Sequence, residues 1–222
     1  MDHTLKAVDE ELATLRRDVS AMGDLTVAQV KGAVDAFANQ DANAAIRIAA
    51  ADDEIDSQDA EIERRAVRFI ALHQPMADDL RAPIAAMKTA MNLERCGDLA
   101  KSIAKRVRQF TQPPTNEQIH EVTKLGQLVC ERLAAVVGAY RTSDAHAALE
   151  VWSKDQEIDQ VHDHVFNGVL AAMASNPGSV EGCTHVLFIS KNLERIGDHA
   201  TNIAELVVYQ VTGQELAGRP KL

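Results

Sequence analysis

The feature that most constrains the fold is an internal repeat at about half the length of the chain. A shift of 103 residues places the DxEID segment at 52–56 on the DxEID segment at 155–159. A shift of 100 residues places NLERxGDxA at 92–100 on NLERxGDxA at 192–200. Agreement over such stretches is too long to be accidental, so we interpret the chain as a tandem duplication. We expect two structural units, residues 1–112 and 113–222.

Within each unit, hydrophobic residues recur every three or four positions, a spacing typical of amphipathic helices. The low aromatic content, 4%, also favours helices over sheets. We predict helices at about 5–37, 42–72, 79–111, 115–140, 144–176 and 179–212. Asp41 is the expected N-cap of the second helix, Thr115 with Gln118 forms a capping box, and Gly213 is the expected C-cap of the last. Short links make successive helices antiparallel, so the predicted fold is all-α, with two tandem pseudo-symmetric three-helix bundles.

Net charge and cysteine content limit which partners and which cellular compartment we expect. The formal net charge of −10 argues against nucleic acid as a partner and favours cations or basic protein surfaces. Three cysteines without a C-x-x-C pair do not make a disulfide framework and suit a reducing cytosol. The N-terminus lacks a signal-peptide pattern, and no uncharged apolar run approaches the ~20 residues that span a bilayer. We therefore expect a cytoplasmic protein that reaches membranes only through partners.

Pairs of carboxylates one helical turn apart recur at matched positions in the two units. Such like charges repel one another unless a cation lies between them, and clustered carboxylate oxygens suit Mg²⁺, Mn²⁺, Ca²⁺ or iron. The predicted metal ligands are Asp52, Asp56, Glu94 and Asp98 in the first unit and Asp155, Asp159, Glu194 and Asp198 in the second. Asp59, His162 and Glu205 are further candidates.

The alternative interpretation is a solvated, salt-bridged helix surface. In the first unit Lys101 and Lys105 lie on the same helix face as Glu94 and Asp98 and can neutralise them. In the second unit the equivalent positions are threonine and glutamate, so we expect the acids there to be unanswered and the metal to bind there more readily. The helical glycines at 97 and 197 indicate close approach of neighbouring helices.

The duplicated segments, LERCGDLA at 93–100 and LERIGDHA at 193–200, resemble the hallmark of the PhoU family, as does the DLR sequence at 79–81. The resemblance spans essentially the whole chain. It implies two three-helix bundles. It also implies, as in some members, that the E/D-x-x-x-D pairs bind magnesium, manganese, iron or zinc ions. It also implies negative control of the phosphate-starvation response, with a phosphate ABC transporter ATPase and a membrane sensor histidine kinase as partners, and a homodimer. Cys96 departs from the usual isoleucine, and Pro83 follows the DLR sequence.

Three functions remain in competition at this point. The first, which the resemblance favours, is a regulator that binds partners and is not an enzyme. The second is a carboxylate-bridged metal protein or metalloenzyme, against which the shortage of histidine ligands counts. The third is a metal-free scaffold whose acids only keep the bundle in solution.

Overall fold

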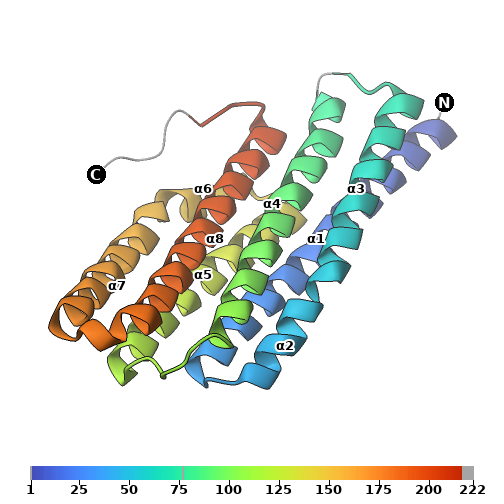
Figure 1. The fold of residues 1–222 in the computed structure, drawn as a ribbon. Coiled ribbons are helices and arrows are strands. Elements are labelled where there is room, and N and C mark those ends of the chain that lie inside the picture. Colours follow the sequence, from blue (N-terminus) through green and yellow to red (C-terminus); the bar gives the residue numbers. More distant parts are fainter. Residues whose placement is uncertain (1, 77, 217–222) are drawn as a thin grey trace.

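The computed structural model describes residues 2–76 and 78–216, and within them every regular element is helical. The helices are α1 (Asp2–Ala38), α2 (Ala42–Ala50), α3 (Asp52–His73), α4 (Asp78–Val107), α5 (Asn116–Thr142), α6 (Ala145–Ser153), α7 (Asp155–Ser175) and α8 (Val180–Thr212), with a short 3₁₀ turn, η1 (Pro177–Ser179), before α8. α2 with α3, and α6 with α7, each form one interrupted leg, and successive legs of the bundle run antiparallel (Figure 1). The predicted all-α fold of paired three-helix units is therefore confirmed.

The helix ends follow from local sequence, as predicted. The Asp41 side chain accepts hydrogen bonds from the backbone N–H groups of Asn43 and Ala44 at the start of α2. Thr115 and Gln118 form a complete capping box at the start of α5. Gly213 ends α8 in the left-handed region, at φ 72°, a conformation that glycine adopts without steric cost.

Two of the legs are interrupted where the sequence predicts continuous helices. The predicted second helix breaks at Ala51 and the predicted fifth at Lys154, so that Asp52 and Asp155 each begin a new helix. Ala51 has φ −73° and ψ −11°, close to helical values, so a small backbone change suffices to interrupt the helix. An acid in the first turn of a helix is favoured by the helix dipole, and both new helices begin with one.

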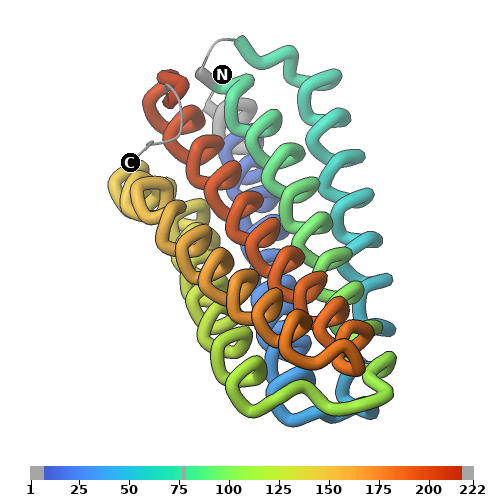
Figure 2. The backbone as a smooth tube through the Cα atoms, turned by 60° about the vertical axis from the view of Figure 1, so that its left-hand side comes forward, coloured from blue at the N-terminus to red at the C-terminus, as the bar shows by residue number. Residues whose placement is uncertain are grey.

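The four uninterrupted helices α1, α4, α5 and α8 form the centre of the molecule, and the interrupted legs cover its two sides. The leg of α2 and α3 packs against α1 and α4, and the leg of α6 and α7 packs against α5 and α8. The two halves meet through α4 against α8 and α1 against α5, an arrangement visible in Figures 1 and 2. Among the described residues, no helix has the length and apolarity to cross a membrane.

Reciprocal contacts relate the halves by a pseudo-two-fold axis. A Cβ atom placed on Gly23 would lie 2.7 Å from the Val137 side chain, and one placed on Gly126 would lie 2.6 Å from that of Val34. The two contacts exchange under the shift of 103 residues. The glycines thus allow α1 and α5 to approach closely at two symmetric points. The predicted boundary at 112/113 lies in the link between α4 and α5, but the division into domains stays a prediction, because one buried core runs through both halves.

Candidate functional site

The Asp52 carboxylate lies in the first turn of α3 and is fully buried where α3 meets α1 and α4. Gln29 Nε2 on α1 donates to Asp52 Oδ1 at 3.0 Å. Lys101 Nζ on α4 donates to Asp52 Oδ2 at 2.8 Å, and this hydrogen bond raises the pKa of Lys101. A buried charge needs such compensation, because removal from water strongly disfavours an isolated carboxylate. Both oxygens of Asp52 are therefore engaged by side chains of the protein.

Gly97 gives the buried carboxylate its space. A Cβ atom at this position of α4 would lie 3.0 Å from Asp52 Oδ1 and 3.1 Å from Gln29 Oε1. At the equivalent Gly197, a Cβ atom would lie 2.7 Å from the Ile158 side chain of α7. The prediction that the two glycines permit close helix approach is confirmed, and in the first half the neighbour is a charged group.

The remaining predicted ligands of the first half lie on the facing sides of α3 and α4. Burial raises the pKa of Glu94, and the nearby charges of Asp98, Asp59 and Asp56 raise it further against the opposing effect of Arg95. Burial also raises the pKa of Asp56, with contributions from Asp52 and Asp98. We call Asp56, Asp59, Glu94 and Asp98 the outer acids. The charges of these four carboxylates on two helices therefore act on one another, while their role as metal ligands stays a prediction.

The cation beside the outer acids is not the one that the sequence suggests. Arg95 lies 3.4 Å from Glu94 and 3.5 Å from Asp98, distances at the long end for an ion pair. Lys101 was expected to neutralise these two acids but bonds Asp52 instead. The reason lies in the packing of the helices. The side chain of Lys101 reaches the start of α3, where an unpaired buried carboxylate would destabilise the fold far more than one on the helix surface.

In the second half, different residues contact the acids at the start of α7. Asp155 is buried at the start of α7 and accepts a 2.6 Å hydrogen bond from the hydroxyl of Thr201, which stands where the first half has Lys101. Arg132, which stands where the first half has Gln29, forms an ion pair with Glu157. The lysine of the first half thus pairs with the buried aspartate from α4, whereas the arginine of the second half pairs with Glu157 from α5.

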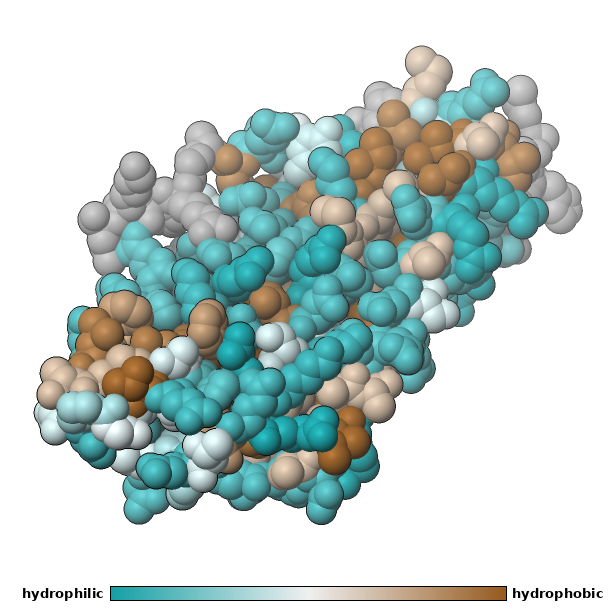
Figure 3. All heavy atoms as spheres, viewed as in Figure 1, coloured by the Kyte–Doolittle hydropathy of each residue, from teal (hydrophilic) through white to brown (hydrophobic). Residues whose placement is uncertain are grey.

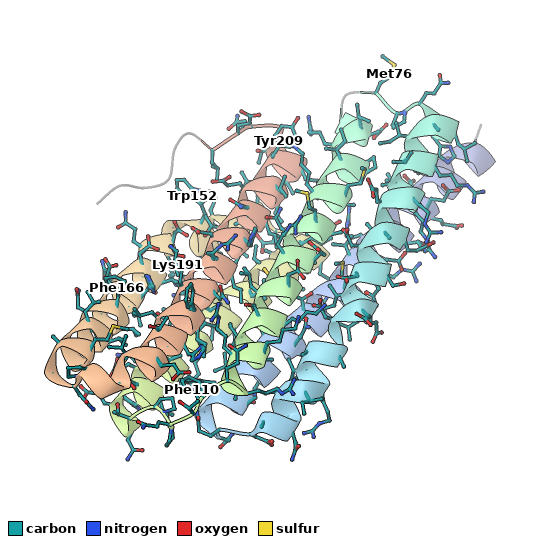
Figure 4. The ribbon with its side chains drawn as sticks, in the orientation of Figure 1. Met76, Phe110, Trp152, Phe166, Lys191 and Tyr209 are labelled. Atoms are coloured by element: carbon teal, nitrogen blue, oxygen red, sulfur yellow. The ribbon has the colours of Figure 1, made fainter. Side chains whose placement is uncertain are left out.

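The prediction that the acids of the second half are unanswered is wrong. Besides the Arg132 pair, Lys191 Nζ lies 2.7 Å from Glu194, and Lys191 is visible on α8 in Figure 4. The less certain candidates are also engaged. His162 Nδ1 lies 2.8 Å from the Ser190 hydroxyl, and Glu205 accepts a 3.1 Å hydrogen bond from the Trp152 indole. Asp159 and Asp198 each take part in interactions of their own.

As arranged here, the Asp52 carboxylate does not fit a metal ion, because Gln29 and Lys101 occupy both of its oxygens. Nowhere in residues 2–76 and 78–216 do three or more histidine, cysteine, aspartate or glutamate side chains converge as a metal-binding group. The predicted metal ligands therefore stay predictions.

Gln29 and Arg132 are the partners that sequence reasoning missed. Neither belongs to a recognisable motif, and each lies on a helix separated from its acid by more than twenty residues. A signal was nevertheless present. The two residues exchange under the 103-residue shift that defines the repeat, so aligning the first helix of each unit would have drawn attention to the difference in charge.

Comparisons with known proteins agree with this architecture. The family model described as "PhoU domain" matches twice, at residues 19–107 and 122–207. The "Phosphate-specific transport system accessory protein PhoU homolog" of Caulobacter vibrioides is 46% identical and aligns over 100% of this chain and 97% of its own length.

Two solved structures have the same fold. The crystal structure of PhoU from Pseudomonas aeruginosa superposes with a TM-score of 0.89 at 33% identity, covering 93% of this chain and 99% of that one. The phosphate transport system regulatory protein PhoU from Streptococcus pneumoniae gives a TM-score of 0.88 at 30% identity, covering 95% and 99%. Repeat, fold and full-length similarity agree, and the chain belongs to the PhoU family.

Proposed function

We propose that this protein regulates phosphate transport and the phosphate-starvation response by binding other proteins, and that it is not an enzyme. The observation that carries the proposal is similarity over the entire chain to proteins named as accessory and regulatory components of phosphate transport. The duplicated LERxGD segments support it, since both copies are present at their expected helical positions in α4 and α8.

The proposed partners are the ATPase of a phosphate ABC transporter and a membrane sensor histidine kinase. An ATP-hydrolysing subunit and a kinase use ATP on the cytoplasmic side, so the proposal places this protein in the cytoplasm. The net charge of −10 favours basic patches on these partners through electrostatic steering. We propose that the protein acts as a homodimer, which presents its acidic surface to these partners.

Retention of purified partners tests the proposal directly. The full chain is immobilised and offered each purified partner at micromolar concentration, with a deletion strain assayed in parallel for phosphate-starvation genes. We expect at least one partner to be retained and the genes to be expressed at high phosphate. If neither partner is retained and the deletion leaves these genes unchanged, the proposal fails.

We also propose that the outer acids respond to a divalent cation of the magnesium, manganese, iron or zinc class. The support is that burial raises the pKa values of Glu94 and Asp56, and that the charges of neighbouring acids raise them further. A cation between α3 and α4 would relieve the repulsion between these charges and supply charge neutralisation there.

Thermal unfolding in the presence of Mn²⁺, Mg²⁺ or Fe²⁺ measures this response. At 100 times its dissociation constant a ligand stabilises the folded state by about 2.7 kcal/mol. We expect the stabilisation to disappear in the Asp98→Asn variant and to survive in an Asp35→Asn control, which changes an exposed acid of α1. No stabilisation by any of the metals would favour the metal-free scaffold, and phosphatase or oxidase activity that scales with bound metal would favour the metalloenzyme.

A further inference from the structure

A groove of about 870 Å³ lies along the seam where α4 meets α8. Its polar side chains include Lys88, Asn92 and Arg95 from α4, and Arg195, His199 and Asn202 from α8. The view of Figure 3 looks onto these two helices, and hydrophilic side chains cover the middle of that face. Tyr209, labelled in Figure 4, belongs to the other end of the groove, where Ile84 and Leu206 add apolar surface.

Hydrogen bonds between the two helices fix the base of the groove. Asn92 Oδ1 lies 2.9 Å from His199 Nδ1 and accepts a 3.4 Å hydrogen bond from Asn202 Nδ2. Asn92 is almost completely buried. Because one amide oxygen joins two side chains of the opposite helix, the spacing of α4 and α8 is set at this point, and the groove is a preformed feature.

The pseudo-two-fold axis brings both arginines of the duplicated LERxGD segments to this one groove. Arg95 and Arg195 exchange under the shift of 100 residues, yet both line it together with Lys88. Both guanidinium groups are close enough to His199 for their charges to act on it. Two acids, Glu205 and Glu215, also line the groove; Glu205 accepts a hydrogen bond from the Trp152 indole, and Arg95 also lies 3.5 Å from Asp98. Lys88, Arg95 and Arg195 thus come together at one groove in a protein of net charge −10.

The symmetric end of the same seam shows why this end is open. There Phe188 stands where this end has Lys88, and Arg106 stands where it has Leu206. The Arg106 guanidinium lies over the Phe188 ring, 4.0 Å from its centroid, and this cation–π contact engages the arginine. At the groove, Leu206 has no aromatic ring that could contact Lys88 in this way. The lysine and the two arginines therefore border an open groove.

We propose that this groove binds a tetrahedral oxyanion of the phosphate type, held by Arg95, Arg195 and Lys88. Guanidinium groups match pairs of phosphate oxygens with two parallel hydrogen bonds, and a lysine adds a point charge. The oxyanion has two sources, free inorganic phosphate or the phosphoryl group of a larger molecule whose organic part would lie against Ile84 and Leu206. The site is independent of the proposed protein partners.

Calorimetric titration of the full chain with inorganic phosphate and with adenosine monophosphate, at constant ionic strength, tests the site and separates the two sources. We expect at least one of the two ligands to bind. Arg195→Gln should weaken that binding about tenfold or more, because a charge-assisted hydrogen bond is lost. Lys88→Gln, on the opposite helix, should weaken it in the same direction.

Arg64→Gln is the matched control, since it removes the same charge from an exposed arginine of α3 away from the groove. Circular dichroism verifies that each variant is folded, and Lys88→Gln provides the decisive comparison if Arg195→Gln is not. Loss of affinity in the groove variants with an unchanged Arg64→Gln supports the site. Absence of binding by both ligands at millimolar concentration, or equal weakening in all three variants, overturns it. Partner retention, measured without phosphate, would not be affected by that failure.

Discussion

Substitution of Lys101 by methionine removes the ammonium group from the buried Asp52 carboxylate and keeps most of the apolar stem of the side chain. The carboxylate is fully buried and the lysine side chain is 25% exposed. Loss of one partner from a buried ion pair costs about 3–5 kcal/mol, because the other charge stays in a low-dielectric site. Since the hydrogen bond from Gln29 remains, we expect the lower end of that range, about 3 kcal/mol.

The reverse change is expected to cost much less. In Asp52→Asn, Gln29 can still donate to the amide oxygen, and the partly exposed Lys101 can turn its ammonium group to water, so we expect about 1 kcal/mol. The double variant should resemble Asp52→Asn rather than the sum of the two single changes, because the stranded charge is gone. At about 2–4 °C per kcal/mol for a chain of this length, Lys101→Met should lower Tm by about 6–12 °C.

Urea unfolding followed by far-UV circular dichroism measures these differences, with an unchanged m-value as the condition for comparing them. Lys31→Met is the control, because it breaks an exposed pair with Asp35 on the surface of α1 and should cost less than about 1 kcal/mol. A Lys101→Met variant as stable as the control would refute the argument, and so would single changes whose costs simply add.

Three further predictions follow from packing and titration. Gly126→Ala should destabilise by about 1–3 kcal/mol in urea unfolding, because its Cβ would overlap the Val34 side chain, whereas Gly138→Ala, with no neighbouring atom within 4 Å, should stabilise by about 0.5–1 kcal/mol. The pKa of Glu94 is raised above its ordinary value of 4.5, so its charged form destabilises the fold as pH rises through that value. Glu94→Gln should therefore increase the free energy of unfolding at pH 7 by less than about 1 kcal/mol, and urea unfolding below about pH 4 should show no such gain. Burial raises the pKa of Cys130 to about 11 and the other two cysteines are buried, so a thiol reagent at neutral pH should modify the native protein slowly and at no more than one site, against three after unfolding.

The sequence predicts the helical framework well because the determinants of that framework are local. Spacing of apolar residues, the Asp41 cap, the Thr115 capping box and the glycine after α8 all act within a few positions along the chain. The break at Ala51 escapes prediction because alanine is a good helix former and its backbone angles stay close to helical.

The candidate site is predicted only in part, for a different reason. Spacing along a helix shows that Glu94 and Asp98 share a face, and the repeat shows that their counterparts do too. It does not show which cation of a neighbouring helix will reach which acid, since the Lys101–Asp52 contact joins residues 49 positions apart. The choice depends on burial, which is a property of the packed bundle rather than of any segment.

The reciprocal glycine–valine contacts between α1 and α5 have a consequence for the origin of the chain. Each half carries a glycine that leaves space and a valine that fills the space left by the glycine of the other half. A single half would therefore be complementary to a second copy of itself. Two free copies could therefore have associated before a link joined them end to end. Once joined, the copies no longer had to stay identical, and the first now pairs Asp52 with a lysine of α4 while the second pairs Glu157 with an arginine of α5.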